Sequence, residues 1–220
     1  MISQLPRWVE YGSFILALVA GLVNAIGLLG FSHQAISHLS GTATLLGTGF
    51  VSASLPEVFH YLLILLSFLI GATISGFFLS SGALRLGRNY SGLLCFEALL
   101  LVASMYCLNQ DYLFGHYLAS AACGLQNALV TNYSGAVVRT THVTGIFTDL
   151  GLMIGARFRG ERFDGRKALL FLLIISGFIL GGSLGAYLFS VLMFYALAIP
   201  AAICVSLALA YSIYNARTRQ

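Results

Sequence analysis

Hydrophobic positions divide the chain into eight long apolar segments separated by short polar stretches. The segments cover residues 12–30, 38–53, 59–84, 91–108, 113–131, 142–156, 167–188 and 190–214. Uninterrupted apolar runs of this kind are typical of helices that lie in a lipid bilayer. The pattern therefore predicts an all-α polytopic membrane protein.

Two of the segments differ from the others in length and composition. Segments 38–53 and 142–156 are shorter than the roughly 20 residues that a spanning helix needs, and both are rich in Gly, Ser and Thr. We interpret them as broken or re-entrant segments, although a shorter spanning helix is the alternative. Irregular backbone at membrane depth is tolerated only inside the protein or beside a watery cavity.

Three sequence blocks occur twice in the same order, which indicates an internal repeat. The pairs are Gly21–Ala25 with Gly124–Ala128 (124 − 21 = 103), His38–Gly47 with His142–Gly151 (142 − 38 = 104), and Phe68–Thr73 with Phe178–Ser183 (178 − 68 = 110). The second pair shares the pattern H-x-[ST]-G-x-x-T-x-L-G. We therefore divide one membrane domain into a first repeat, residues 1–110, and a second repeat, residues 111–220.

Composition and charge fix the expected topology. The chain is 59% hydrophobic and only 8% charged, with a formal net charge of +4; soluble domains carry about 25% charged residues. If the two short segments re-enter and six helices span, all arginine clusters fall on the cytoplasmic side, as the positive-inside rule requires. These clusters are Arg7, Arg85 with Arg88, Arg139, Arg157–Lys167, and Arg217 with Arg219. With eight spanning segments, Arg85 and Arg88 fall outside.

Three spanning helices per repeat is an odd number, so the two copies are predicted to be inserted in opposite orientation. This is the inverted-repeat plan of many secondary transporters. It places both termini in the cytoplasm.

The two short segments carry the candidate binding site. Ser40-Gly41 and Thr144-Gly145 stand where a half-helix can begin with a hydroxyl N-cap, and two such N-termini at the midplane favour an anionic group. The candidate substrate-binding residues are Asn24, His38, Ser40, Gly41, Thr44, Asn127, His142, Thr144, Gly145 and Thr148. Alternatively, the small residues serve only close helix packing, and the two asparagines serve as links between helices.

Two acidic residues inside apolar segments are candidates for proton or ion coupling. Asp149 lies seven residues after His142 on the same helical face, and Glu97 lies inside an apolar run. Intramembrane carboxyl groups are functional candidates because burying a charge is costly. Asp149 near the inner surface, paired with Arg157 or Arg139, is the alternative. Glu97 as a protonated core group is equally open.

Other chemistry finds little support in the sequence. The four cysteines stand singly, without metal-ligand spacing, and we interpret them as small core residues. Neither H-E-x-x-H nor G-x-S-x-G occurs. We therefore expect no enzyme activity, cofactor, metal or nucleic-acid partner. His60 and His116 stand near segment ends, where interfacial positions are common. Glycine faces around Gly71 and Gly181 suit either internal packing or a homodimer.

The repeated blocks resemble the YoaK-like family of bacterial inner-membrane proteins. The resemblance rests on Gly21–Ala25, His38–Gly47 and Gly124–Ala128 through Thr141–Gly151. It implies a bacterial inner-membrane location and no particular substrate. The family's first copy often reads Ser/Thr-Gly-Asn-Thr-Thr, whereas this chain has Ser40-Gly41-Thr42-Ala43-Thr44.

These observations together favour a small secondary transporter for an unidentified small solute, bound between the two broken segments. A channel of the same architecture is the nearest alternative. A membrane scaffold or sensor follows, and an intramembrane enzyme is the least favoured.

Overall fold

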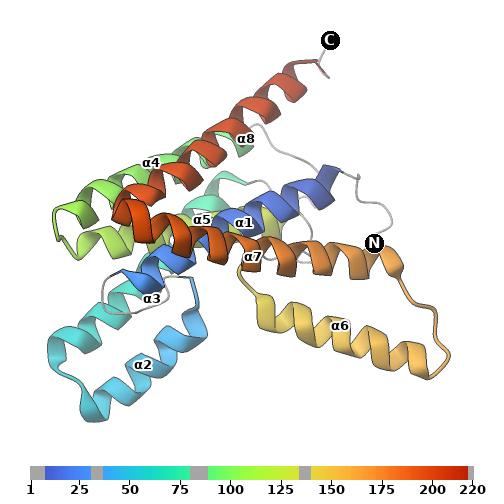
Figure 1. Ribbon diagram of the computed structural model, residues 1–220, viewed down its shortest axis with the longest axis horizontal. Coiled ribbons are helices and arrows are strands. Elements are labelled where there is room, and N and C mark those ends of the chain that lie inside the picture. The colour runs from blue at the N-terminus through green and yellow to red at the C-terminus, as the bar shows by residue number, and fades with distance from the viewer. Residues whose placement is uncertain (1–7, 31–36, 80–88, 134–139, 218–220) are drawn as a thin grey trace.

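The computed structural model describes residues 8–30, 37–79, 89–133 and 140–217, and all regular structure in these ranges is helical (Figure 1). The elements are α1 (Trp8–Leu29), α2 (Leu39–Ser52), α3 (Leu55–Phe78), α4 (Tyr90–Asn109), α5 (Phe114–Tyr133), α6 (Val143–Phe158), α7 (Gly165–Leu192), the 3-10 helix η3 (Met193–Leu197) and α8 (Ala198–Arg217). Each of the eight predicted apolar segments corresponds to one α-helix. The all-helical fold is therefore confirmed.

Helix α3 begins four residues before the predicted apolar segment. Its first turn contains Pro56 and Glu57, and Ser54 precedes it. The Glu57 carboxylate accepts hydrogen bonds from the Ser54 backbone N–H at 2.8 Å and from the Ser54 hydroxyl at 2.9 Å. The capping residues are polar, so hydropathy alone does not assign them to the helix.

Four stretches of the described chain are long and apolar enough to cross a membrane. They are Trp8–Leu29, Leu55–Phe78, Tyr90–Asn109 and Gly165–Ala216. The last stretch contains both α7 and α8. Helix α5 is not among them, because it carries His116, Ser120 and Gln126, which are at most 2% exposed. A helix that packs against protein rather than lipid needs no apolar surface.

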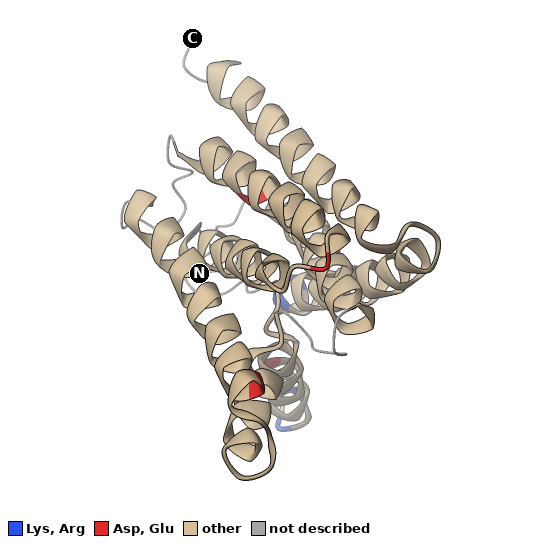
Figure 2. Ribbon diagram, turned by 90° about the vertical axis from the view of Figure 1, so that its left-hand side faces the viewer, with Lys and Arg blue, Asp and Glu red and all other residues tan. Residues whose placement is uncertain are grey.

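The outer surface of the bundle is apolar and part of its interior is polar. Leu69 and Phe77 of α3 and Leu172 and Ile179 of α7 are more than half exposed. Ser75, Ser104 and Ser120 are fully buried. Figure 2 shows that the helices are free of charged residues over most of their length. This distribution is compatible with a lipid environment.

In the centre of the bundle, helices of the first half of the chain pack against helices of the second half. Helix α1 packs against α7, and α5 packs against α3. Helices α2 and α6 lie on one side of this core, against α3 and α7, whereas α4 and α8 pack against each other on the other side (Figure 1). Because the halves are joined through these contacts, they form one packed unit.

Equivalent glycines make the close contacts in both central pairs. A β-carbon at Gly21 would overlap the carbonyl oxygen of Phe178, and one at Gly124 would overlap the carbonyl oxygen of Phe68. Gly71 and Gly181 approach backbone carbonyls of the partner helix in the same way. Every one of these positions belongs to the repeated sequence blocks. The glycine faces thus serve packing within the chain.

Five of the ten arginines that fix the predicted topology lie outside the described residues. These are Arg7, Arg85, Arg88, Arg139 and Arg219. Within the described ranges, Arg166 at the start of α7 forms an ion pair of 2.8 Å with Glu10 at the start of α1. That pair ties the two helix beginnings together at one end of the bundle.

Candidate functional site

Helices α2 and α6 begin beside one cavity, at the level of the middle of α3 and α5. The cavity has a volume of about 280 Å³. Its lining consists of Ser37, His38, Leu39, Ser40, Phe68, Asn127, Thr141, His142, Val143 and Thr144. Residues far apart in the sequence thus meet at the beginnings of the two short helices.

The N-caps are the two histidines, so the predicted hydroxyl caps were wrong by two positions. The His38 carbonyl already accepts the Thr42 N–H at 3.2 Å, and the His142 carbonyl accepts the Ile146 N–H at 3.2 Å. Each helix therefore starts directly after its histidine, and Ser40 lies within the first turn. Neither histidine side chain makes a capping hydrogen bond. The first amides of each helix thus have no acceptor within the helix.

Each histidine ring lies over the first turn of its own helix, where a glycine makes room for it. A β-carbon at Gly41 would lie 2.9 Å from His38 Nδ1, and one at Gly145 would lie 3.0 Å from His142 Nδ1. The Ser40 hydroxyl lies 3.3 Å from His38 Nε2. The shared H-x-[ST]-G pattern therefore has a physical explanation, because the glycine accommodates the imidazole.

Asparagines of the two long helices hold the short helices in place. The Asn24 carboxamide oxygen accepts hydrogen bonds from the Ser37 N–H at 3.2 Å and from the Ser37 hydroxyl at 2.9 Å. In the second half, the Thr141 hydroxyl donates to the Asn127 carboxamide oxygen at 3.3 Å. In each half, the residue directly before the histidine is thus linked to an asparagine, and the two asparagines are equivalent in the repeat.

Seven of the ten residues that line the cavity have polar side chains, and none of the ten is acidic. Two histidines, several hydroxyl residues and the first turns of two helices face the same region. Helix N-termini carry about half a positive elementary charge. The arrangement is therefore suited to a small solute that accepts hydrogen bonds, and a negative charge on that solute is favoured.

Comparison with known proteins places the chain in a family. The family model described as "Protein of unknown function (DUF1275)" matches residues 12–210. The chain belongs to this family. The match covers all eight helices at least in large part and is consistent with the YoaK-like resemblance. The comparisons with curated proteins and with solved structures gave no match. Membership in this family brings no assigned substrate.

Five of the ten predicted binding residues line the cavity, namely His38, Ser40, Asn127, His142 and Thr144. Asn24, Gly41 and Gly145 lie in the supporting contacts described above. Thr44 and Thr148 do not line it: their hydroxyls donate to the Ser40 and Thr144 carbonyls of their own helices, at 2.9 and 3.0 Å.

The two predicted coupling residues lie away from the cavity lining. Asp149 is exposed on α6, and neither of the two ion pairs found among the described residues involves it. Glu97 is 2% exposed in α4, beside Cys204 of α8. The structure thus places both carboxyl groups outside the cavity lining.

Sequence reasoning missed five of the lining residues, namely Ser37, Thr141, Phe68, Leu39 and Val143. The signal for the first two is present, because the repeated motif starts one residue earlier and reads [ST]-H-x-[ST]-G. Phe68 belongs to the third repeated block, for which the sequence predicts no binding role. His60 and His116 are also deeper than expected: they are 9% and 2% exposed, in the contact between α3 and α5. Among the cysteines, Cys123 and Cys204 are core residues, whereas Cys95 is exposed.

Proposed function

We propose that the protein is a small secondary transporter of a bacterial inner membrane and that it holds its solute between the first turns of α2 and α6. The observation that carries this proposal is the cavity at which the two helices begin, with a histidine of each at its lining. Broken helices whose N-termini meet at a solute site are a recurring feature of transporters. The proposal includes no enzymatic step.

The short helices support the re-entrant topology. Helix α2 has 14 residues and α6 has 16, which correspond to about 21 and 24 Å, less than the hydrocarbon thickness of about 30 Å. Both begin at the shared cavity in the middle of the bundle. Each therefore extends from the midplane toward one surface, and six helices remain to span the bilayer with both termini in the cytoplasm.

The two helix pairs that join the halves support an inverted repeat. The α1–α7 and α3–α5 pairs have equivalent partners in the two halves, with equivalent glycines at the contacts. Opposite insertion of two such halves gives a site between them that can face either side of the membrane. Alternating access then arises when one set of helices rocks against the other.

The decisive test is thermal stabilisation of the purified protein in detergent by a library of small anions, neutral metabolites and cations. A ligand that binds only the native state stabilises it by about 2.7 kcal/mol at a hundredfold excess over Kd. We expect small anions to raise the melting temperature of the parent protein. We also expect His38→Ala and His142→Ala to abolish that rise while they still fold.

Thr44→Ala and Thr148→Ala are matched controls, because these hydroxyls belong to the same helices but do not line the cavity. They should retain the ligand-induced rise. Loss of the rise in the controls, or its persistence in both histidine variants, would place the solute elsewhere. Once a ligand is known, flux into vesicles distinguishes a transporter, whose rate saturates at low solute concentration, from a channel.

A further inference from the structure

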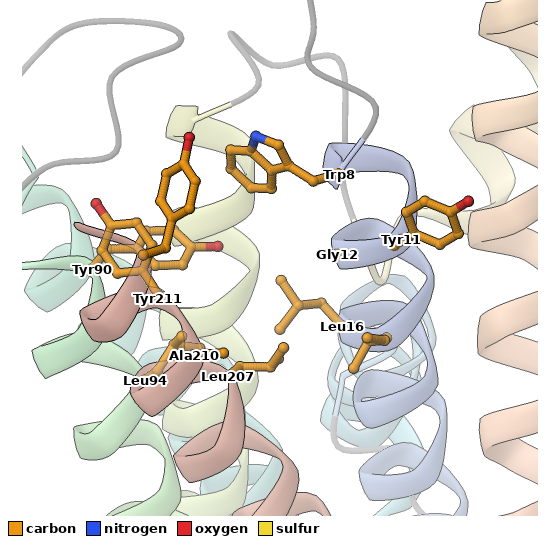
Figure 3. Close-up of a pocket in the computed structure, with 11 residues that line it drawn as sticks. Trp8, Tyr11, Gly12, Leu16, Tyr90, Leu94, Leu207, Ala210 and Tyr211 are labelled. Atoms are coloured by element: carbon orange, nitrogen blue, oxygen red, sulfur yellow. The ribbon is translucent and has the colours of Figure 1, made fainter. Parts of the chain in front are cut away.

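A second cavity lies between α1 and α8, on the opposite side of the core from α2 and α6. Its volume is about 350 Å³. Figure 3 shows Trp8, Tyr90 and Tyr211 at its upper end and Leu16, Leu94 and Leu207 lower down. We call this cavity the aromatic groove. Its lining includes Trp8 at the beginning of α1 and Tyr214 in the last turn of α8.

Glu97 lies one helical turn beyond the lower end of the aromatic groove. It follows Leu94 by three residues on α4, and Cys204 precedes Leu207 by three residues on α8. Residues three apart lie on the same face of a helix, displaced by about 4.5 Å along its axis. The leucines therefore separate the groove from the Glu97–Cys204 pair by a single layer of side chains.

The Glu97 carboxyl group is deeply buried and only partly satisfied. It is 2% exposed, and its Oε2 atom has no hydrogen-bond partner among the described residues. Neither of the ion pairs formed by these residues includes it. A carboxylate without a nearby cation is costly in such surroundings, whereas a neutral carboxyl group is tolerated.

The groups that face Glu97 favour a proton over a metal cation as its ligand. The titratable neighbours on the packed helices are the thiols of Cys204 on α8 and Cys123 on α5. Hard cations such as Mg²⁺ and Ca²⁺ take several oxygen ligands, which these thiols do not supply. A proton needs only the carboxyl group itself.

The two repeats differ at the groove, because the space beside one glycine is open and the space beside the equivalent glycine is filled. Gly115 of α5 corresponds to Gly12 of α1, since 115 − 12 = 103, the offset of the first repeated block. A β-carbon at Gly115 would lie 2.5 Å from the Leu108 side chain and 2.9 Å from the Ser104 carbonyl oxygen of α4. At Gly12, which lines the groove, nothing lies within 4 Å. In the repeat, the pair α8–α1 is equivalent to the pair α4–α5. The close contact that Gly115 makes with α4 therefore has no counterpart at Gly12.

We infer that Glu97 is a proton-binding site and that the aromatic groove is its access path from the end of the bundle where α1 begins. The inference adds to the proposed transport function, and a role of Glu97 as the coupling site rests on that function. Proton binding and access themselves are measurable without transport.

The test is labelling of the reconstituted full-length protein with dicyclohexylcarbodiimide, which adds to protonated carboxyl groups in apolar surroundings. Mass spectrometry of the Glu97 peptide gives the initial rate. We expect the rate to fall as the pH is raised, because deprotonation removes the reactive form. We expect Gly12→Leu, which fills the groove, to slow the labelling at least about fivefold, whereas Gly76→Leu leaves it unchanged. Gly76 is the matched control because a β-carbon there would also have nothing within 4 Å and because Gly76 does not line the groove.

Ala210→Phe fills the groove from the α8 side and provides the same test if Gly12→Leu does not fold. Absence of label at Glu97, a rate that does not change with pH, or equal rates in the parent and both filled variants would overturn the inference. Labelling that depends on pH and on the groove, in a protein that no solute stabilises, would support the proton site and remove the proposed transport function.

Discussion

At the residue scale, the repeated H-x-[ST]-G pattern couples an imidazole to a glycine that makes space for it. The rings of His38 and His142 lie over Gly41 and Gly145, and the nearest ring nitrogen is 2.9 or 3.0 Å from where each β-carbon would stand. A methyl group at either glycine therefore displaces the ring slightly, with little effect on the backbone. We propose that the motif positions a polar group at the cavity rather than stabilising the fold.

We predict that Gly41→Ala and Gly145→Ala separate binding from stability. Alanine gains about 1 kcal/mol of helix propensity over glycine, which offsets the displacement of an exposed histidine side chain. The melting temperature without ligand should stay close to the parent value. The rise caused by the anion that stabilises the parent most should shrink clearly. A large loss of stability without ligand would contradict this account of the motif.

The candidate site could be predicted in part, because polar residues repeated in two short segments have few structural roles in a membrane. The convergence of His38, His142 and Asn127 followed from that argument. Thr44 did not follow the expected pattern. Thr44 follows Ser40 by four residues and therefore lies on the same face of α2. Its hydroxyl nevertheless donates to the Ser40 carbonyl, and it does not line the cavity. Sequence spacing defines a face of a helix, not the direction in which the face points.

At the element scale, hydropathy identified every helix but did not show which helices pack together. Helix α5 illustrates the reason. Its buried His116, Ser120 and Gln126 make it too polar to qualify as a span by composition, and this polarity reflects its central position. The pairs α1–α7 and α3–α5 depend on contacts between segments that lie far apart in the sequence. The repeated glycines were a sign of these contacts, yet they did not name the partner helix.

A prediction at this scale concerns those glycines. In Gly21→Ala or Gly124→Ala, the added methyl group meets a backbone carbonyl, and the two helices must move apart. Overpacking of this kind costs typically about 1–3 kcal/mol, and we expect a lower melting temperature in both variants. Gly76→Ala is the control, since its position is open and the substitution should be neutral or stabilising. Equal melting temperatures in all three variants would show that the close contacts are not needed.

At the scale of the whole molecule, opposite orientation of the two halves is the feature on which the transport proposal depends. The turn after α2 and the turn after α6 occupy equivalent places in the two repeats. If α2 and α6 both re-enter, these turns lie on opposite sides of the membrane. If all eight helices span, both turns lie in the cytoplasm. The two topologies therefore predict opposite sides of the membrane for the turn after α2, and the same side for the turn after α6.

Cysteine labelling from each side of the membrane distinguishes the two topologies. Ser52→Cys and Glu161→Cys place single cysteines in the two exposed turns, in a protein whose four native cysteines are replaced by alanine. In right-side-out vesicles, a membrane-impermeant maleimide should label Ser52→Cys and not Glu161→Cys. Inside-out vesicles should give the reverse. Glu161→Cys is labelled from the cytoplasm in both topologies, so it confirms vesicle orientation. Labelling of Ser52→Cys from the cytoplasm would establish eight spanning helices, remove the opposite orientation, and leave the cavity at α2 and α6 without a basis for alternating access.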